Sequence, residues 1–270
     1  MSALLQISDP HFGTEQAPVM AALLRLAQAQ QPEVVVWSGD ITQRARRAQF
    51  DAARRFADQI KAPYRLVIPG NHDIPLFNVA ARLLAPYANF RRAFGHELEP
   101  VISTPRWLVI GVNTTRPWRH KDGEVSARQI ERVAARLKVA QPGQIKVVVV
   151  HQPVSVTLDK DRENLLRGHE AALLGWGAAG VDLILGGHIH LPYVVQQHVL
   201  RATTDHPFWV VQAGTALSSR VRGGQANSVN LIRRATVPGQ PASIERWDFQ
   251  AEQEDFALVN RLDADVPTAR

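Results

Sequence analysis

The chain contains 270 residues, of which 45% are hydrophobic, and it carries a formal net charge of +6 at pH 7. This length and hydrophobic content predict one large domain with a full core, and the absence of cysteine excludes a disulfide framework. No apolar run reaches membrane-spanning length, and the basic charge invites nucleic-acid binding without establishing it.

Segments of strand and helix character alternate along residues 1–190. Short apolar runs have the length of buried strands, and between them the apolar residues recur at helical spacing. A strand-rich stretch follows, broken by Asp-His-Pro, Gly-Gly and Pro-Gly turns. The expected strands are 3–7, 33–37, 64–68, 98–102, 107–112, 145–150, 181–185, 193–200, 208–212, 229–235 and 243–249, and the expected helices are 19–29, 42–61, 126–138 and 161–179.

This order of elements predicts an α/β fold in which helices cover two facing sheets. We expect one domain over residues 1–250. Residues 76–106 mix helical and aromatic positions and are a candidate lid. Residues 251–270 hold five acidic residues against two arginines and show no regular pattern, so we expect a polar C-terminal tail that is solvated or contacts a partner.

Five of the expected strands end in loops that carry aspartate, asparagine or histidine. Taken singly, each histidine is an ordinary hydrogen-bonded loop residue. In an open α/β sheet, however, the strand ends on one edge line the crevice where ligands bind. Seven oxygen and nitrogen ligands are too many for one tetrahedral site and suit two divalent ions that share a carboxylate. The seven residues are Asp9, His11, Asp40, Asn71, His151, His188 and His190.

These loop motifs resemble those of the calcineurin-like metallophosphoesterase superfamily. The resemblance implies a four-layer αββα sandwich of two facing mixed β-sheets flanked by helices. The motifs are Asp-x-His at 9–11, Gly-Asp at 39–40, Gly-Asn-His-Asp at 70–73, a strand-end histidine at 151 and Gly-His-x-His at 187–190. A narrower similarity, to bacterial members grouped with class III cyclic nucleotide phosphodiesterases, rests on residues 212–216, 220–223 and 227–228.

The resemblance also implies a role for each polar side chain. Asp40 would bridge two divalent metal ions, and a metal-bridging hydroxide would attack phosphorus directly. His72 would face the leaving group as a catalytic proton donor, and Asp73 would orient and polarise it. Nitrogen and oxygen ligands without thiolate fit Mn, Fe, Co, Ni or Zn. The first ion would be held by Asp9, His11 and His190, and the second by Asn71, His151 and His188.

Four cationic side chains follow later strand ends and are candidates for binding the substrate phosphate. The ordinary interpretation is that they lie on surface turns. The other arginines occur as scattered pairs, mostly at positions that a helix would expose, so a nucleic-acid partner stays open but is not favoured. The four candidates are Arg220, Arg222, Arg116 and Lys121.

The predicted function is hydrolysis of phosphodiester bonds in small molecules, with 3′,5′-cyclic nucleotides as candidates. The alternatives are a nuclease or phosphatase acting on another phosphoester, including a nucleotide-linked lipid precursor, and a non-catalytic scaffold on the same fold. An intact ligand set together with His72 argues against the scaffold. Because Asp9 leaves no room for a signal peptide before it, a cytoplasmic location is expected. The oligomeric state stays open.

Overall fold

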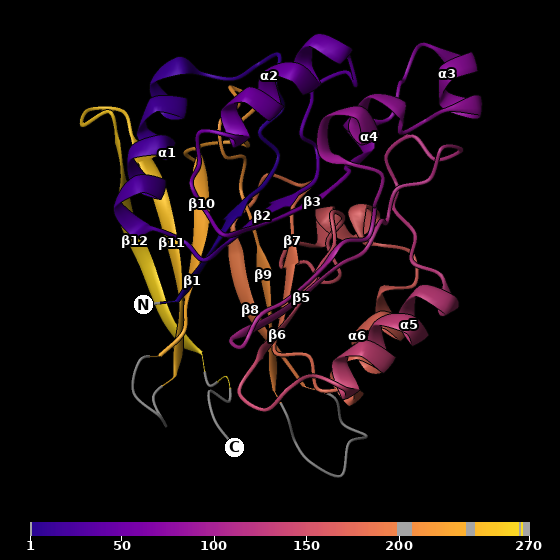
Figure 1. Ribbon diagram of the computed structural model, residues 1–270, viewed down its shortest axis with the longest axis vertical. Coiled ribbons are helices and arrows are strands. Elements are labelled where there is room, and N and C mark those ends of the chain that lie inside the picture. The colour runs from indigo at the N-terminus through magenta and orange to yellow at the C-terminus, as the bar shows by residue number, and fades with distance from the viewer. Residues whose placement is uncertain (1, 199–206, 236–240, 265, 267–270) are drawn as a thin grey trace.

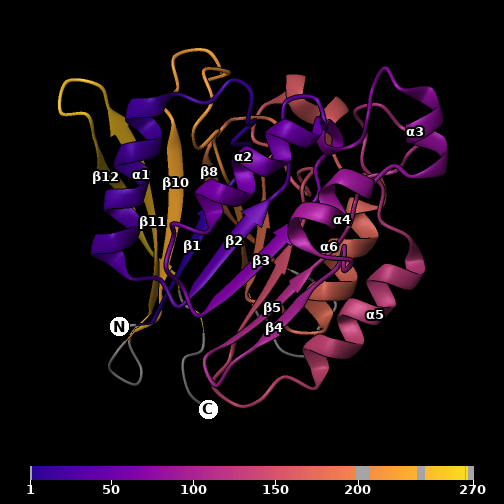
Figure 2. The ribbon, with the colours of Figure 1, turned by 45° about the horizontal axis from the view of Figure 1, so that its top comes forward.

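The parallel strands in the two halves of the chain build two separate sheets. The computed structural model describes residues 2–198, 207–235, 241–264 and 266. Figure 1 and Figure 2 show the two sheets face to face, with helices on their outer sides. Each sheet has six strands and mixes parallel with antiparallel pairs. The expected αββα sandwich is therefore confirmed.

The first sheet joins strands from both ends of the chain. Its strands are β1 (Ala3–Ile7), β2 (Val34–Ser38), β3 (Tyr64–Ile68), β10 (Ser228–Arg233), β11 (Ala242–Gln250) and β12 (Asp255–Ala264). They lie in the order β12-β11-β10-β1-β2-β3. In this register Leu5 of β1 is opposite Val35 of the parallel strand β2 and Leu231 of the antiparallel strand β10.

The second sheet comes from the middle of the chain. Its strands are β4 (Val101–Ser103), β5 (Trp107–Gly111), β6 (Ile145–Val149), β7 (Leu183–Gly186), β8 (Tyr193–Gln197) and β9 (Phe208–Gln212). They lie in the order β4-β5-β6-β7-β9-β8, with the four inner strands parallel and the two edge strands antiparallel to their neighbours. The expected strand 193–200 ends at Gln197, and residues 199 and 200 lie outside the described residues.

The helices are divided between the outer faces. On the first sheet lie α1 (Ala17–Gln30), α2 (Arg47–Ala57) and α4 (Ala88–Phe94), and on the second lie α5 (Ala127–Lys138) and α6 (His169–Ala178). The remaining helices are α3 (Val79–Leu84), which buries none of its residues, and the 3-10 turns η1 (Asn71–Asp73) and η2 (Asp159–Asn164). No helix within the described ranges is long and apolar enough to cross a membrane.

Alternation along the strands separates the core between the sheets from the cores under the helices. In β2, Val34 and Val36 belong to the core between the sheets, whereas Val35 and Trp37 belong to the core beneath the helices of the first sheet. Because both faces of such a strand are covered, its sequence is a continuous apolar run. This is why the central strands could be located from composition.

Two helices begin later than expected. Helix α2 begins at Arg47 and not at residue 42, because the Thr42 hydroxyl accepts a hydrogen bond from the Ala45 backbone N–H at 3.0 Å and Ala45 has a φ of 52°. Such a local side-chain bond competes with helix formation. Helix α6 begins at His169, after Gly168 with a φ of 86°, and the preceding residues form η2.

The expected polar tail over residues 251–270 is wrong for half of its length. Residues Asp255–Ala264 form β12, which pairs antiparallel with β11 at the edge of the first sheet. Phe256 is buried beneath the helices and Ala264 in the core between the sheets. An edge strand carries many exposed polar side chains, so its acidic composition resembled that of a tail. Residues 265 and 267–270 lie outside the described part of the chain.

The candidate lid over residues 76–106 is divided in the same way. Helix α4 buries Phe90 and Ala93 beneath the first sheet's helices, and β4 pairs with β5. These parts belong to the sandwich because their apolar residues are buried in it. Helix α3 alone stands outside the packed layers, as Figure 1 shows at its upper right.

Candidate metal centre and active-site cavity

The loops after the parallel strands of both sheets meet at one edge of the sandwich. Backbone N–H groups of Asp9 and His11 donate to the carbonyls of Gly39 and Asp40, which binds the loop after β1 to the loop after β2. Beneath them the Gln6 side chain donates to Ser38 Oγ at 3.1 Å and to the Gly186 carbonyl at 2.9 Å. This buried amide connects the ends of β2 and β7 across the two sheets. The seven predicted ligands are thereby brought together.

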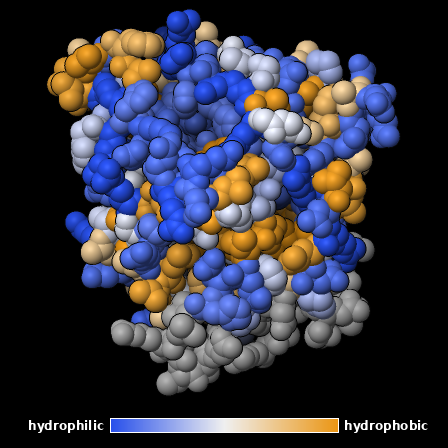
Figure 3. Space-filling model, turned by 180° about the vertical axis from the view of Figure 1, so that it is seen from behind, coloured by the Kyte–Doolittle hydropathy of each residue, from blue (hydrophilic) through white to orange (hydrophobic). Residues whose placement is uncertain are grey.

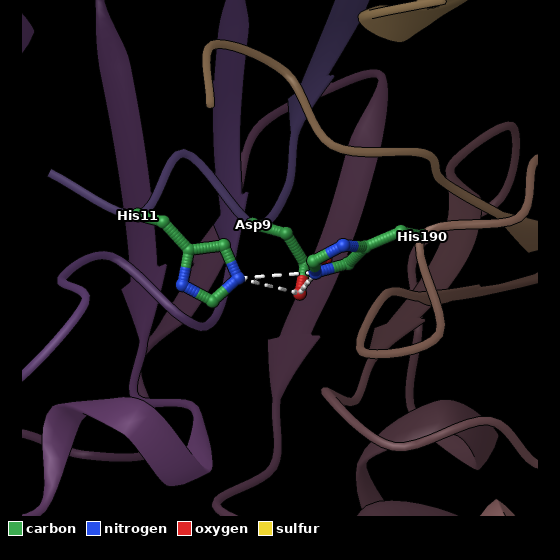
Figure 4. Close-up of side chains that lie close together, drawn as sticks. All are labelled: Asp9, His11 and His190. Carbon is green, nitrogen blue, oxygen red and sulfur yellow. Dashed lines mark hydrogen bonds and ion pairs between the residues drawn. The ribbon is translucent and has the colours of Figure 1, made fainter. Parts of the chain in front are cut away.

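Asp9, His11 and His190 form a first cluster, drawn in Figure 4. One ligand atom from each lies within 4.8 Å of the others. His190 Nε2 is 3.3 Å from Asp9 Oδ1, and His11 Nε2 is 3.0 Å from His190 Nε2. The three side chains point toward one another (Figure 4), Asp9 and His11 from the loop after β1 and His190 from the loop after β7. A carboxylate and two imidazoles in this arrangement match the donors that hold divalent transition metals.

Asp40, His151 and His188 form a second cluster of the same kind. His151 Nε2 lies 3.2 Å from Asp40 Oδ1 and 3.2 Å from Asn71 Oδ1, which adds the amide to the group. The other carboxylate oxygen of Asp40 is 3.7 Å from His11 Nε2 in the first cluster. Asp40 therefore lies between the clusters, where a shared carboxylate is expected.

The hydrogen bonds of the histidines fit a pair of metal sites. His151 Nδ1 lies 2.9 Å from the Ser38 carbonyl oxygen, and His190 Nδ1 lies 2.7 Å from the Arg220 carbonyl oxygen. Because a carbonyl oxygen only accepts, each Nδ1 carries a hydrogen and each Nε2 faces the cluster, where it can coordinate a metal once it is deprotonated. In addition, Nδ1 of His188 is buried and has no hydrogen-bond partner, as a nitrogen reserved for a metal would be.

Burial and charge shift the pKa values of the cluster residues in different directions. Burial lowers the pKa of His11 to about 3, and burial together with the nearby His151 lowers the pKa of His188 to about 3. Burial alone would raise the pKa of Asp9, but its hydrogen bond and charge interaction with His190 outweigh this and lower that pKa to about 2. Neutral imidazoles and an ionised carboxylate are the ligand forms of these side chains. Burial alone would lower the pKa of His151, but the nearby Asp40 raises that pKa to about 9. Burial would likewise lower the pKa of His190, but the hydrogen bond to Asp9 raises it. These two imidazoles must therefore release a proton when they bind a cation.

The backbone at the clusters adopts a conformation that ordinary residues avoid. Among the described residues, eight residues other than glycine have a positive φ, and five of them are cluster residues with φ between 44° and 75°. Such left-handed conformations cost about 1–3 kcal/mol each and collect at functional sites. The five are Asp9, His11, Asp40, His188 and His190.

Two glycines let the ligand loops approach one another. A Cβ atom on Gly39, which has a φ of 97°, would lie 2.4 Å from His151 Nδ1. A Cβ atom on Gly70 would lie 2.1 Å from the Asp40 backbone nitrogen. Any side chain at either position would displace a cluster residue, which explains the glycine in front of Asp40 and in front of Asn71.

His72 lies beside the second cluster without being part of either cluster. Its backbone N–H donates to Asp40 Oδ1 at 2.8 Å. Its Nδ1 lies 3.0 Å from the Gln43 carbonyl oxygen, so Nδ1 carries a hydrogen and Nε2 is left to contact other groups. That Nε2 is 3.5 Å from Arg220 Nη1, at the wall of the cavity described below.

Asp73 does not have the contacts that the sequence suggested. Its carboxylate accepts hydrogen bonds from the backbone N–H groups of Ile41, Thr42 and Gly70, and its partners include no atom of the His72 ring. Burial and the nearby Asp40 raise the pKa of Asp73 to about 6. The expectation that Asp73 orients His72 is corrected: the group on Nδ1 is the Gln43 carbonyl, a backbone atom that no side-chain motif reveals.

A cavity of about 710 Å³ opens above the second cluster and includes Asp40, Asn71 and His72 in its lining. Three of the four cationic candidates also line it. They are Lys121, Arg220 and Arg222. Lys121 forms an ion pair with Glu163 at 3.0 Å, and Arg220 Nη1 donates to Gln43 Oε1 at 2.8 Å. Arg222 Nη2 donates to both carboxylate oxygens of the buried Asp161, at 2.9 and 3.0 Å.

Arg116 is not among the residues that line the cavity. Its Nη1 donates to the backbone carbonyls of Asn113 and Thr115, and its Nη2 donates to Gln129 Oε1 at 2.7 Å. These bonds hold the loop after β5 against α5. The expectation that Arg116 binds phosphate is corrected, because its donors are already used inside the protein.

Comparison with known proteins agrees with this geometry. Residues 3–192 match the profile of the calcineurin-like phosphoesterases. A probable cyclic nucleotide phosphodiesterase from Synechococcus is 25% identical over 204 residues, which cover 71% of this chain and 74% of the relative.

Two solved structures show the same fold at lower identity. Purple acid phosphatase from yellow lupin seeds has a TM-score of 0.69 at 11% identity, covering 97% of this chain. The chain spans 53% of that phosphatase. Vps29 from Chaetomium thermophilum has a TM-score of 0.51 at 11% identity, covering 99% of this chain and 100% of its own. With the family profile extending over most of the sandwich and over all seven expected ligands, the chain belongs to the calcineurin-like phosphoesterase family.

Proposed function

We propose that the protein is a phosphodiesterase that uses two divalent metal ions to hydrolyse small-molecule substrates, with 3′,5′-cyclic nucleotides as the first candidates. One observation carries the proposal: two ligand clusters meet at Asp40, beside a cavity in which His72 exposes a proton-exchanging nitrogen. The similarity to a probable cyclic nucleotide phosphodiesterase supports the choice of candidates. A scaffold would have no use for a proton donor beside the two clusters.

The proposed metal ligands are the six side chains of the two clusters together with Asn71. Nitrogen and oxygen donors without thiolate support first-row ions such as Mn, Fe, Co, Ni or Zn. When bound, two such ions supply an activated water near neutral pH and neutralise charge on the phosphoryl oxygens. The first ion would be held by Asp9, His11 and His190, the second by Asn71, His151 and His188, and Asp40 would contact both.

The chain's own side chains would control the leaving group. His72 keeps one hydrogen on Nδ1 through the Gln43 carbonyl, so a second proton on Nε2 is available to the departing oxygen. Arg220 lies next to that nitrogen and has a guanidinium that can donate to a phosphoryl oxygen. Both groups lie in the wall of the same cavity, so one substrate could contact both.

A substrate panel tests this function. Purified protein loaded with Mn²⁺ should hydrolyse cyclic nucleotides and bis-aryl phosphates faster than phosphomonoesters or single-stranded DNA, and chelation should abolish the activity. A preference for monoesters would replace the diesterase by a phosphatase. A preference for DNA would replace it by a nuclease, and inactivity toward the whole panel with metal bound would support a scaffold.

Arg220 and Arg222 should respond differently to truncation. Arg220→Ala is expected to lower kcat/KM about ten- to hundredfold, since a charge-assisted hydrogen bond contributes about 1.5–3 kcal/mol. Arg222→Ala should mainly lower the melting temperature, because it leaves the buried Asp161 without its bidentate partner. Steady-state kinetics and thermal melts of both variants, with metal content as a control, make the comparison. Unchanged kinetics in Arg220→Ala would show that it only bonds Gln43 at the surface.

A further inference from the structure

A group of large apolar side chains is exposed on and around α3. Phe77 is 80% exposed, Leu84 is 86% exposed and Trp118 is 71% exposed, and Val79 and Leu83 are also exposed. We call these five residues the α3 patch. Figure 3, which shows the molecule from behind, has a hydrophobic group at its upper left, where α3 lies. Contiguous exposed apolar groups of this kind commonly mark binding surfaces.

The patch is held in place by polar bonds and not by a core. Arg82 of α3 donates through Nε to the Pro117 carbonyl at 2.6 Å and through Nη2 to the Arg119 carbonyl at 2.6 Å. These two bonds flank Trp118 and tie its loop to the helix. A six-residue helix that buries none of its residues would not persist alone. The structure therefore holds α3 in position while leaving its apolar side chains open.

The patch borders the cavities beside His72 through two neighbouring residues, Leu76 and Arg44. Leu76, which precedes Phe77, lines a small cavity together with Asn71, His72 and Arg44. Arg44 also lines the main cavity, and its guanidinium carbon lies 5.5 Å from the centre of the Phe77 ring. One cation thus connects the catalytic cavity to the first aromatic ring of the patch.

We propose that the α3 patch binds the apolar part of the substrate's leaving group, so that the preferred substrate is an amphiphilic phosphodiester. This inference rests on the proposed function. The anionic diester would lie among Arg44, Lys121 and Arg220, and the leaving alcohol would extend past His72 over α3. We assign the patch to the leaving-group side of the substrate because His72, the proton donor, and Leu76, the residue before Phe77, line the same small cavity. A membrane surface or a protein partner would not require this continuity with His72.

A series of methyl alkyl phosphodiesters tests the proposal, with alkyl chains of two, six and ten carbons at concentrations below micelle formation. The alcohols have similar acidity, so chain length changes binding and not chemistry. We expect kcat/KM to rise about ten- to hundredfold from the shortest to the longest chain, since a fully buried methylene gives about fourfold and the open α3 patch would bury the equivalent of roughly two to three of them. The long-chain alcohol, and not methanol, should be the alcohol released.

The double variant Leu83→Gln/Leu84→Gln should bring the ratio of kcat/KM between the longest and shortest chains close to one. Val139→Gln is the matched control, because Val139 is 79% exposed at the end of α5 and should leave the ratio unchanged. Hydrolysis without chain-length dependence would overturn this inference and leave the proposed function intact. Hydrolysis of cyclic nucleotides but of none of these diesters would overturn this inference alone, whereas inactivity toward both would overturn the proposed function as well. Loss of phosphatidylglycerol-vesicle binding in the double variant, without chain-length dependence, would assign the patch to a membrane surface instead.

Discussion

Asp40→Ala should lose both metal ions and reduce kcat by more than about 10³-fold, because two bound cations contribute several kcal/mol to the transition state. The carboxylate lies between the clusters, 3.2 Å from His151 Nε2 and 3.7 Å from His11 Nε2. Elemental analysis of wild type should give close to two divalent ions per chain, and the variant should give fewer than one.

Two further variants separate a shared ligand from a merely structural residue. Asp40→Asn keeps the shape of the side chain and an acceptor for the His72 N–H, so it should fold normally while still binding metal weakly. His190→Ala removes a residue of the first cluster only and should lower the metal content toward one ion. A full complement of metal in Asp40→Ala, or a fully active wild type with a single ion, would contradict the two-metal proposal.

His72→Ala should slow hydrolysis strongly only when the leaving group is a poor one. Departure of an alkoxide from phosphorus needs a proton, and a positioned general acid contributes about 10²–10⁴-fold. An activated aryl oxide needs much less help. The variant should therefore lose about 10²–10⁴-fold on a diester with a ribose or alkyl leaving group and little on a nitrophenyl diester. Single-turnover rates on the two substrates measure the difference.

Metal content and thermal stability of His72→Ala should match those of wild type. The bond from the residue 72 backbone N–H to Asp40 survives the substitution, and the ring is not in either cluster. Loss of metal would identify His72 as a ligand. An equal slowing of both substrates would mean that His72 positions the phosphate and does not donate a proton.

The two candidate metal clusters could be located from the sequence because their side chains sit next to strong local signals. Asp9, Asp40 and His151 each follow a buried apolar strand at once, and the strand ends of a parallel sheet converge. The αββα arrangement could be predicted for the same reason. Strand β12 could not be predicted. Its apolar residues Leu258 and Val259 are nearly half exposed at the sheet edge, and its acidic residues obscure the alternation of apolar and polar positions that is typical of a strand.

The roles of residues whose partners are backbone atoms could not be predicted from the sequence. Asp73 follows His72 directly, which suggested a pair, but its carboxylate turns to backbone N–H groups instead. Arg116 follows a strand end, which suggested a phosphate ligand, but loop carbonyls already occupy its donors. Side-chain types show which chemistry is available, whereas these assignments depend on which backbone atoms lie within reach.

The position of β1 between β2 and β10 matters while the chain is being synthesised. Leu4 pairs with Ile232, so β1 has one open edge until the ribosome has delivered β10. At about 5–20 residues per second this takes roughly 10–50 s. An apolar strand with an open edge can pair with strands of other nascent chains. His190 is likewise synthesised long after Asp9 and His11, so the first candidate metal cluster can form only late in translation. Translational pauses between codons 190 and 228 would prolong the interval in which β1 has an open edge.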